Sequence, residues 1–337
     1  MSENERILLA HGGGGRLSEE LLRNVILPRL GNSVLARLTD AAELMIGGTR
    51  IAMSTDSFTV DPIFFPGGDI GSLAVHGTIN DVAMVGADPV CLSCGFIIAE
   101  GFPMAALERI VDSMAKSATA AGVQIVTGDT KVVGRASMDG IFINTTGLGV
   151  ISPEVRLGAN RVSAGDKVII SGTLADHGVT ILCQRQGLAF DIPVVSDSAP
   201  LHRLAAALRV LGPSLKFMRD PTRGGLAATL NELVRNAPWG IRIDEQSIPM
   251  APAVAAALEI IGLDPLHVAN EGKLVAVVAA GSEERALTLL RSSPLGANAR
   301  LIGEITNEHQ GLVVMKTNIG GARIIDNPAG ELLPRIC

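Results

Sequence analysis

Apolar residues recur along this chain at two spacings, which predict helices and strands in succession. Spacing of the helical kind covers residues 17–30, 71–85, 175–187, 201–211, 251–262 and 282–293. Short apolar runs predict strands at 50–55, 90–98, 123–127, 140–150, 167–171, 273–280, 300–305 and 311–316. The predicted elements therefore mix helices and strands over the whole chain.

The helix after Pro103 has the clearest pattern of all. Proline suits the first helical position, and Gly122 suits the end of the same helix. Its apolar stripe follows the spacing i, i+3, i+4, i+7 and i+11 with Leu107, Ile110, Val111, Met114 and Ala118. A further helix is expected to begin at Asp220-Pro-Thr-Arg-Gly-Gly225 and run to about Asn236.

Turn-rich segments divide the chain. Residues 1–15 end in a glycine run and predict a flexible loop, and residues 151–166 are the best candidate for a domain boundary. From Gly320 onward the chain is expected to be irregular. We therefore expect domains at 1–155 and 156–319, followed by a flexible tail at 320–337.

Composition and charge narrow the class of protein. A length of 337 residues favours two domains, and 47% hydrophobic with 18% charged residues is typical of globular chains. The net charge is −6 without a basic run, which argues against nucleic-acid binding. The first residues are too charged for a signal peptide, and no apolar run has membrane length. The prediction is a cytoplasmic protein that binds neither nucleic acid nor membrane.

Four cysteines are too few for a disulfide framework in a chain of this length. Cys91 and Cys94 have the spacing of a metal pair, but no second pair completes a zinc site, so burial in a strand is favoured. Cys183 lies in an apolar helical stretch and is also expected in the core. The final residue, Cys337, stands beside the terminal carboxylate, which raises its pKa. We expect it to stay out of the core and to carry a chemical group.

Acidic residues recur at predicted strand ends, beside glycines or small polar residues: Asp40, Asp56, Asp81, Asp129 and Asp220. Magnesium takes carboxylates together with substrate phosphates, and glycine-rich loops can bind phosphate through their N–H groups. Any one of these aspartates could equally cap a helix or begin a turn. As a set, with Lys131 and Arg223 as phosphate partners, they favour a metal–nucleotide site. No P-loop or dinucleotide-binding motif is present.

Glu271 lies in Asn270-Glu-Gly-Lys273, directly before a very apolar strand. A carboxylate in that place could act as a general base, although an ordinary turn with an exposed glutamate fits the same pattern. His76 and His177 also lie near glycine-rich segments and are interpreted as structural residues.

The motifs in their order carry a resemblance to a known family. They are His11-Gly-Gly-Gly-Gly15, Ser54-Thr-Asp-Ser57, Asn80-Asp81, Thr127-Gly-Asp-Thr-Lys131, Asp220-Pro-Thr-Arg-Gly-Gly225, Asn270-Glu-Gly-Lys273 and the terminal Pro334-Arg-Ile-Cys337. Together they resemble the HypE family, the carbamoyl dehydratases of nickel–iron hydrogenase maturation. The acidic and glycine motifs are shared with aminoimidazole ribonucleotide synthetase, selenophosphate synthetase and thiamin-monophosphate kinase, whereas the terminus is specific to HypE.

The resemblance implies a fold and a set of partners. The N-terminal domain would be an α/β domain for ATP binding and dimerisation, whose strands pair across a homodimer into a β-barrel. The C-terminal domain would be α+β, with ATP in the cleft between the two. HypF, a carbamoyltransferase, would load a carbamoyl group onto Cys337, and cyanide would pass from the resulting thiocyanate to iron on the HypC–HypD complex.

It also implies roles for single residues. Metal ligands for Mg²⁺ would be Asp40, Asp56, Asp81 and Asp220. ATP would be held by Asn80, Asp129, Thr130 and the run His11, Gly12, Gly13, Gly14 and Gly15. Lys131 and Arg223 would stabilise charge, Glu271 would accept protons, and Cys337 would carry the reacting group.

Two alternatives remain open at this point. The chain could be another ATP-dependent enzyme of the superfamily, a small-molecule kinase or ligase. It could also be a non-catalytic thiol carrier in which ATP only moves the tail. Thiamin-monophosphate kinase and aminoimidazole ribonucleotide synthetase need no terminal cysteine, which favours the dehydratase.

Overall fold

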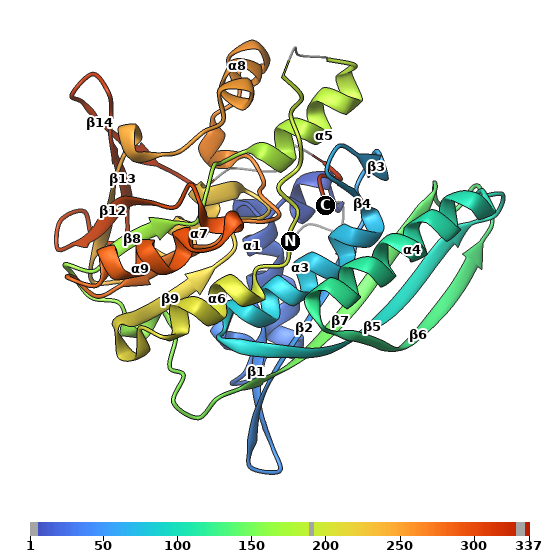
Figure 1. The fold of residues 1–337 in the computed structure, drawn as a ribbon, viewed down its shortest axis with the longest axis horizontal. Helices are drawn as coiled ribbons and strands as arrows, with labels where there is room; N and C mark the ends of the chain where they lie inside the picture. Colours follow the sequence, from blue (N-terminus) through green and yellow to red (C-terminus); the bar gives the residue numbers. More distant parts are fainter. Residues whose placement is uncertain (1–5, 189–191, 328–333) are drawn as a thin grey trace.

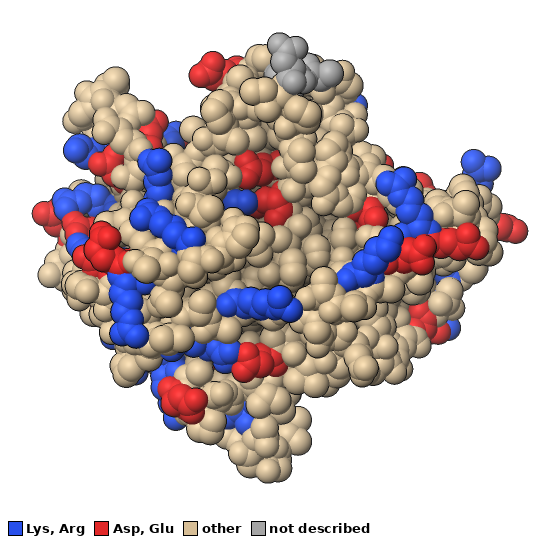
Figure 2. Space-filling view, in the orientation of Figure 1, with Lys and Arg blue, Asp and Glu red and all other residues tan. Residues whose placement is uncertain are grey.

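Two large sheets with helices packed on them build the molecule (Figure 1). The structure is a computed structural model, and it describes residues 6–188, 192–327 and 334–337. The C-terminal end of the chain lies in the interior of the view, near the junction of the two halves. On the face shown in Figure 2, basic and acidic side chains are interspersed.

The N-terminal sheet has the strand order β1-β2-β7-β5-β6. Neighbours run antiparallel except β5 and β6, which are parallel. The strands are β1 (Ala42–Ile46), β2 (Thr49–Phe58), β7 (Ile141–Ile151), β5 (Ala87–Ala99) and β6 (Gln124–Val133). Within the described residues this sheet does not close on itself, so β1 and β6 are its edges.

Helix α3 (Ile70–Met84) is the central helix of the molecule. It packs on strands β2, β5 and β7 and against α4 (Met104–Ala121), so nearly all of its residues are buried. Small residues allow the close packing: a Cβ on Gly71 would lie 2.5 Å from the Ile110 carbonyl oxygen, and one on Gly77 would lie 2.9 Å from the Phe58 ring. Asp81 is therefore held on a rigid, buried element.

The C-terminal sheet has the order β14-β13-β10-β12-β8-β11-β9. Its strands are β8 (Lys167–Ile170), β9 (Leu215–Arg219), β10 (Gly240–Asp244), β11 (Val275–Val278), β12 (Arg300–Thr306), β13 (Val313–Lys316) and β14 (Ala322–Ile325). Strand β11 is apolar throughout because it is buried on both faces. Val275 and Val277 join one core cluster, whereas Ala276 and Val278 join another.

Helices cover both faces of this sheet. Helices α6 (His202–Arg209) and α9 (Glu283–Arg291) pack on one face, and α7 (Gly225–Val234) packs on the other. Helices α5 (Asp176–Gln186) and α8 (Pro252–Ile261) pack on the core of the N-terminal half. Short 3-10 turns link the elements at Leu35–Arg37, Ala159–Arg161, Gly212–Ser214, Glu245–Ser247, Pro265–His267 and Pro294–Gly296.

The first helix is expected over 17–30, and the structure confirms it as one helical run with a π turn inside it. The run comprises α1 (Arg16–Leu21), the π turn Leu22–Ile26 and α2 (Leu27–Leu30). Part of the segment expected to be a loop has local structure, whereas Gly13, Gly14 and Gly15 belong to no helix or strand. A 3-10 turn, Leu9–Gly12, precedes α1 there, and residues 1–5 lie outside the described residues.

Several strands differ from the expectation. Strands β1, β9, β10 and β14 have no counterpart in it. Residues 128–131 and Asp56 were expected just after strands but lie inside β6 and β2. A hairpin of β3 (Phe64–Phe65) and β4 (Gly68–Asp69), also absent from the expectation, lies between β2 and α3.

The irregular tail expected from Gly320 is wrong in its first part. Residues 322–325 form β14 and pair with β13, because backbone pairing along a sheet edge needs little periodic signal. Residues 328–333 lie outside the described residues. Cys94 and Cys183 are buried as expected. Among the described residues, no helix is both long and apolar enough to cross a membrane.

Candidate active site

A cavity of about 280 Å³ lies where the two halves of the molecule meet. Acidic residues from both halves line it, and they come from positions far apart in the chain: Asp40, Asp56, Asp81, Asp220, Glu232 and Glu271. Two arginines, Arg219 and Arg223, face them, and Cys337 completes the lining. The fold thus places most of the predicted acidic residues around one cavity with the terminal thiol.

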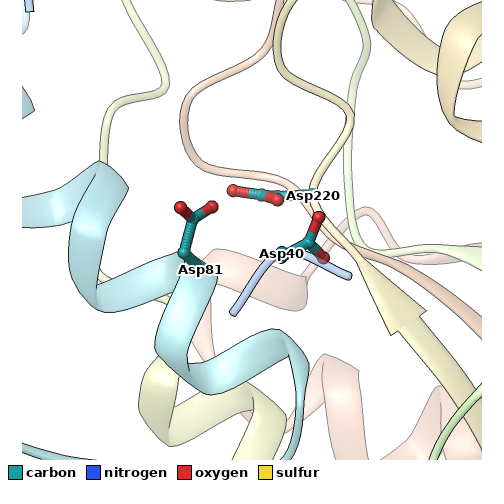
Figure 3. A group of neighbouring side chains, drawn as sticks. All are labelled: Asp40, Asp81 and Asp220. Carbon is teal, nitrogen blue, oxygen red and sulfur yellow. The ribbon is translucent and has the colours of Figure 1, made fainter. Parts of the chain in front are cut away.

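Three aspartates form the centre of the acidic group (Figure 3). Asp40 precedes β1, Asp81 lies on α3 and Asp220 follows β9, and one carboxylate oxygen of each lies within 4.8 Å of the others. The Ser54 Oγ is 2.6 Å from Asp81 Oδ2 and 3.0 Å from the Asp40 carbonyl oxygen. Asp56, on β2, lines the same cavity.

Burial raises the pKa of each carboxyl in this group, and repulsion by the other aspartates raises those of Asp81 and Asp220 further. Burial is the larger cause, and it raises the pKa of Asp40 to about 6 and that of Asp220 to about 8. The pKa of Asp81 is also raised well above its usual value, by burial and then by the charges of Asp220, Asp40 and Asp56. A divalent cation would relieve this repulsion, and oxygen ligands of this kind are those that Mg²⁺ prefers. The donor set therefore fits magnesium.

The two arginines have different surroundings. Arg219 contacts Asp40 at 2.9 Å and Glu232 at 2.7 Å, so its charge is shared between two carboxylates. Arg223 lies 4.0 Å from Asp56, and the charge of Cys337 is the main cause that raises its pKa. Arg223 is therefore the cation best placed to meet an anionic ligand near the terminal residue.

The glycine run contacts Arg223 directly. Gly14 has a positive φ of +77°, and a Cβ there would lie 2.9 Å from both the Arg223 Cβ and its carbonyl oxygen. Among the described residues of the run, Gly14 is the one that lines the cavity. Gly12 accepts a hydrogen bond of 3.4 Å from Arg223, and the His11 Nδ1 accepts one of 3.0 Å from the Leu8 N–H.

Glu271 is buried, with 3% of its surface exposed, at the wall of the cavity. Its Oε1 has no hydrogen-bond partner within the part of the chain that the structure describes. Burial is the main cause that raises its pKa well above the usual value, followed by the charges of Asp220 and Asp56. A carboxyl with a raised pKa is a stronger base once ionised, which suits it to accept a proton.

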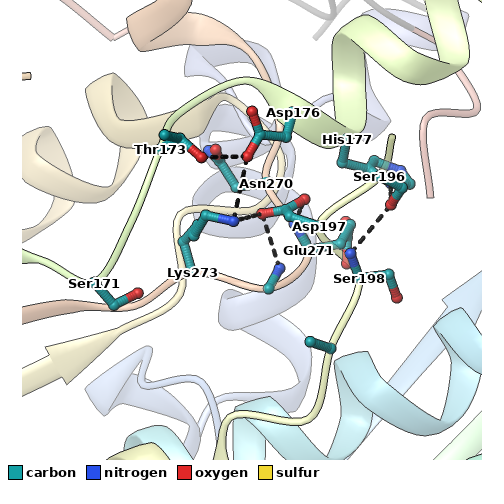
Figure 4. A network of polar contacts seen from close by, with 12 residues as sticks. Ser171, Thr173, Asp176, His177, Ser196, Asp197, Ser198, Asn270, Glu271 and Lys273 are labelled. Atoms are coloured by element: carbon teal, nitrogen blue, oxygen red, sulfur yellow. Dashed lines mark hydrogen bonds and ion pairs between the residues drawn. The ribbon is translucent and has the colours of Figure 1, made fainter. Parts of the chain in front are cut away.

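A buried network holds the main chain around Glu271 (Figure 4). Asp197 accepts hydrogen bonds from the N–H groups of Glu271 at 3.1 Å and Gly272 at 3.2 Å. Lys273 lies 3.1 Å from Asp197 and 3.3 Å from Asp176. Sequence reasoning missed Asp197, whose surroundings in Ser196-Asp-Ser198 carry no distinctive spacing, and it gave Lys273 no role although the motif includes it.

Asn80 supports the same wall from α3. Its Nδ2 donates to the carbonyl oxygens of Ala199 at 3.0 Å and Glu271 at 3.5 Å, and its Oδ1 accepts from the Leu201 N–H at 2.7 Å. With its amide bonded in this way and 1% of its surface exposed, Asn80 positions the main chain around the cavity.

Asp129, Thr130 and Lys131 are not brought to this cavity within one chain. They lie on the exposed strand β6, where Lys131 forms an ion pair of 3.0 Å with Asp129. Strand β6 is separated from β2 by β5 and β7, which corresponds to about 14 Å between the outer strands.

The end of the chain is packed into the molecule. A terminal carboxylate oxygen of Cys337 accepts hydrogen bonds from the Thr59 N–H at 2.9 Å and the Thr59 Oγ1 at 3.1 Å. Ile336 is 3% exposed and belongs to the core, and Cys337 packs against the same core. The expectation that the last residue stays out of the core is wrong, because the main chain of the final residues is hydrogen-bonded.

Comparison with known families matches both halves of the chain. Residues 38–151 match the N-terminal domain of AIR synthase related proteins, and residues 163–316 match the C-terminal domain. Carbamoyl dehydratase HypE of Rhizobium leguminosarum bv. viciae is 51% identical over 335 residues, covering 99% of this chain and 96% of that protein.

Two solved structures are similar over nearly the full length. A HypE–HypF complex contains a chain with 46% identity and a TM-score of 0.87, covering 91% of this chain and 99% of that one. A hydrogenase maturation protein HypE in complex with ATP has 49% identity and a TM-score of 0.82, covering 98% of this chain and 100% of that one.

Proposed function

The chain belongs to the carbamoyl dehydratase HypE family of AIR synthase related proteins, and we propose that it converts a carbamoyl group on Cys337 into a thiocyanate with the use of ATP. The observation that carries this proposal is the position of Cys337 in the lining of the acidic cavity. A chain end that enters a site with a carboxylate base and an arginine has the arrangement of a tethered substrate.

The reaction explains why such groups are needed. In the thioester Cys337–S–C(=O)–NH₂, the oxygen is a poor leaving group until a phosphoryl group from ATP is attached to it. Loss of that oxygen as phosphate and of both nitrogen protons leaves Cys337–S–C≡N, with ADP and phosphate as the other products. The atoms balance because the carbamoyl oxygen leaves as part of the released phosphate.

Each cavity residue then has a task. Asp40, Asp81 and Asp220, with Asp56 beside them, would hold Mg²⁺, which supplies charge neutralisation for the nucleotide phosphates. Arg223 and the N–H groups of the glycine run would stabilise phosphate charge. Neutralising Asp220 and Asp56 would also lower the pKa of Glu271, so that its carboxylate can accept a nitrogen proton.

We also propose a homodimer that completes the N-terminal sheet into a β-barrel. All residues of β6 but Val133 are exposed, and Met45 and Ile46 at the β1 edge are exposed as well. Pairing β6 of one chain with β1 of another would cover both edges. Because Asp40 directly precedes β1, this pairing would bring Asp129, Thr130 and Lys131 of a second chain toward the cavity.

The partners follow from the chemistry of the tail. The carbamoyl group must come from a carbamoyltransferase, for which we propose HypF, and the cyanide must pass to an iron acceptor, for which we propose the HypC–HypD complex. The solved HypE–HypF complex supports the first of these. The last residues, 334–337, would move out for loading and delivery, and we keep 1–155 and 156–319 as proposed domain limits.

The test uses the full chain carbamoylated on Cys337 and incubated with Mg–ATP. We expect ADP and phosphate to form while the C-terminal peptide loses the mass of one water. Glu271→Gln should bind ATP but leave the peptide mass unchanged, because an amide cannot accept the protons. ATP turnover without a change of mass would contradict the dehydratase and support a thiol carrier in which ATP only moves the tail.

A further inference from the structure

The last four residues lie in a groove that contacts their main chain. Arg185 donates to the carbonyl oxygens of Pro334, at 2.6 Å, and Arg335. The Nε2 of His177 lies 2.7 Å from the Ile336 carbonyl oxygen. The Thr59 N–H and Oγ1 donate to a terminal carboxylate oxygen of Cys337, so each of the four last residues has a bonded main-chain oxygen.

The Nε2 of His177 is the atom that donates to the tail. A carbonyl oxygen can only accept, so the Nε2 of His177 must carry the proton. The Nδ1 lies 2.8 Å from the Ser196 Oγ, which itself accepts from the Ser198 N–H at 3.1 Å. Ser196 therefore donates to Nδ1 and fixes the neutral Nε2–H form. The Phe65 ring meets the imidazole edge-on with centroids 5.4 Å apart, which fixes the plane of the ring.

His177 and Arg185 are spaced to span the tail. They occupy the first and last turns of α5, eight residues apart, which corresponds to about 12 Å along a helix axis. The carbonyl groups that they bind belong to three successive residues, Pro334, Arg335 and Ile336, and Arg335 has a positive φ of 54°. Arg185 also donates to the Asp61 carbonyl oxygen, so its guanidinium bridges the tail and the segment after β2.

Side-chain contacts add to this recognition. Ile336 is inserted into the core, and the Arg335 guanidinium donates to the Thr59 carbonyl oxygen at 2.9 Å and to Asp139 at 2.8 Å. None of these groups belongs to the lining of the catalytic cavity among the described residues. They form a separate site one residue away from the thiol.

We propose that His177 and Arg185 form a docking site for the main chain of residues 334–337 and thereby position the Cys337 thiol at the catalytic cavity. The two side chains are positioning residues, because they bind the carbonyl groups of Pro334, Arg335 and Ile336 and act through the main chain of the tail. The use of this position in catalysis rests on the proposed function, whereas the docking itself does not.

The experiment measures how fast N-ethylmaleimide modifies Cys337 in the full chain, by mass spectrometry of the C-terminal peptide and without ATP or carbamoylation. His177→Ala should raise the rate about fivefold and Arg185→Ala about tenfold, because a neutral and a charge-assisted hydrogen bond to the tail are lost. His177→Gln should return the rate toward that of the wild type, since its amide N–H can donate to the Ile336 carbonyl. Gln184→Ala, an exposed position on the same helix, is the matched control and should leave the rate unchanged.

Buried Cys94 and Cys183 report unfolding in the same samples. The proposal is overturned by wild-type rates in both alanine variants, by parallel exposure of the two buried cysteines, or by failure of His177→Gln to restore protection. Because the measurement needs no turnover, a protein that docks its tail but lacks dehydratase activity would contradict only the proposed function.

Discussion

The acidic cluster illustrates how single residues are tuned for a ligand. Asp40, Asp81 and Asp220 are held close together by three separate elements, and burial raises the pKa of each. Such an arrangement lowers the free energy of unfolding of the metal-free protein, because unfolding lets each carboxyl ionise in water. Its presence is explained by a function that requires the charges to converge.

A substitution at Asp220 tests this explanation. The pKa of this carboxyl is raised to about 8 in the folded protein, so the folded state holds more protons than the unfolded state between about pH 4 and pH 8. Stability of the metal-free wild type should therefore fall as the pH rises through this window. The Asp220→Asn variant should lose less stability over the same pH range. At pH 8 its free energy of unfolding should exceed that of the wild type by at least about 1 kcal/mol.

Urea unfolding in the presence of a chelator, at pH 4 and at pH 8, measures both proteins. Added Mg²⁺ should then stabilise the wild type more than Asp220→Asn, since only the wild type has the full set of ligands. An equal loss of stability in the two proteins between these pH values would contradict the role given to repulsion.

Among the elements, the segment after Val195 connects parts of the molecule that meet at the site. Ser196 contacts His177, Asp197 binds the main chain of Glu271, and Ser198 lies 3.1 Å from His76 on α3. The segment carries no regular secondary structure, yet its polar side chains tie together the tail site, the base and the central helix. The segment is held in place by these hydrogen bonds to His177, Glu271 and His76.

Asp197→Ala should show how much this segment contributes. The substitution removes one of two carboxylates from buried Lys273 and two hydrogen bonds from the main chain at 271–272. We expect the free energy of unfolding to fall by about 3 kcal/mol, as for other buried ion pairs that lose a partner. Glu20→Ala, which removes an exposed pair with Arg16, should cost less than about 1 kcal/mol. Equal effects in urea unfolding would show that Asp197 is not a structural support.

For the whole molecule, the N-terminal sheet leaves an edge that another chain could cover. Strand β6 exposes Val126 at 59% and Val132 at 67%. Exposed apolar edge strands of this length favour pairing with a second strand. This is the structural basis of the proposed homodimer.

Lysine substitutions on β6 test that proposal. Val126→Lys with Val132→Lys should shift the protein from dimer to monomer, because charged side chains disfavour edge-to-edge pairing. Ile260→Lys, at an apolar position of α8 that is 69% exposed, is the control and should remain a dimer. Light scattering on a sizing column measures the mass, and a wild-type monomer or an unaffected double variant would contradict the pairing.

Sequence by itself determined the elements with strong periodicity and the chemistry of the motifs. Helices α3 and α4 lie close to the predicted ranges because their apolar spacing is long and continuous. The terminal cysteine and the ordered acidic and glycine motifs were enough to identify the family, since these residue types have few other uses in that order.

Only the tertiary structure decided which residues meet. Asp40, Asp81 and Asp220 converge on one cavity. Lys131 also belongs to one of the predicted site motifs, but it lies on the distant edge strand β6. Asn80 serves the main chain, and His177 contacts the tail 159 residues away. The physical reason is that periodicity records the local environment of a residue, whereas convergence depends on contacts between distant segments and on the direction of each side chain.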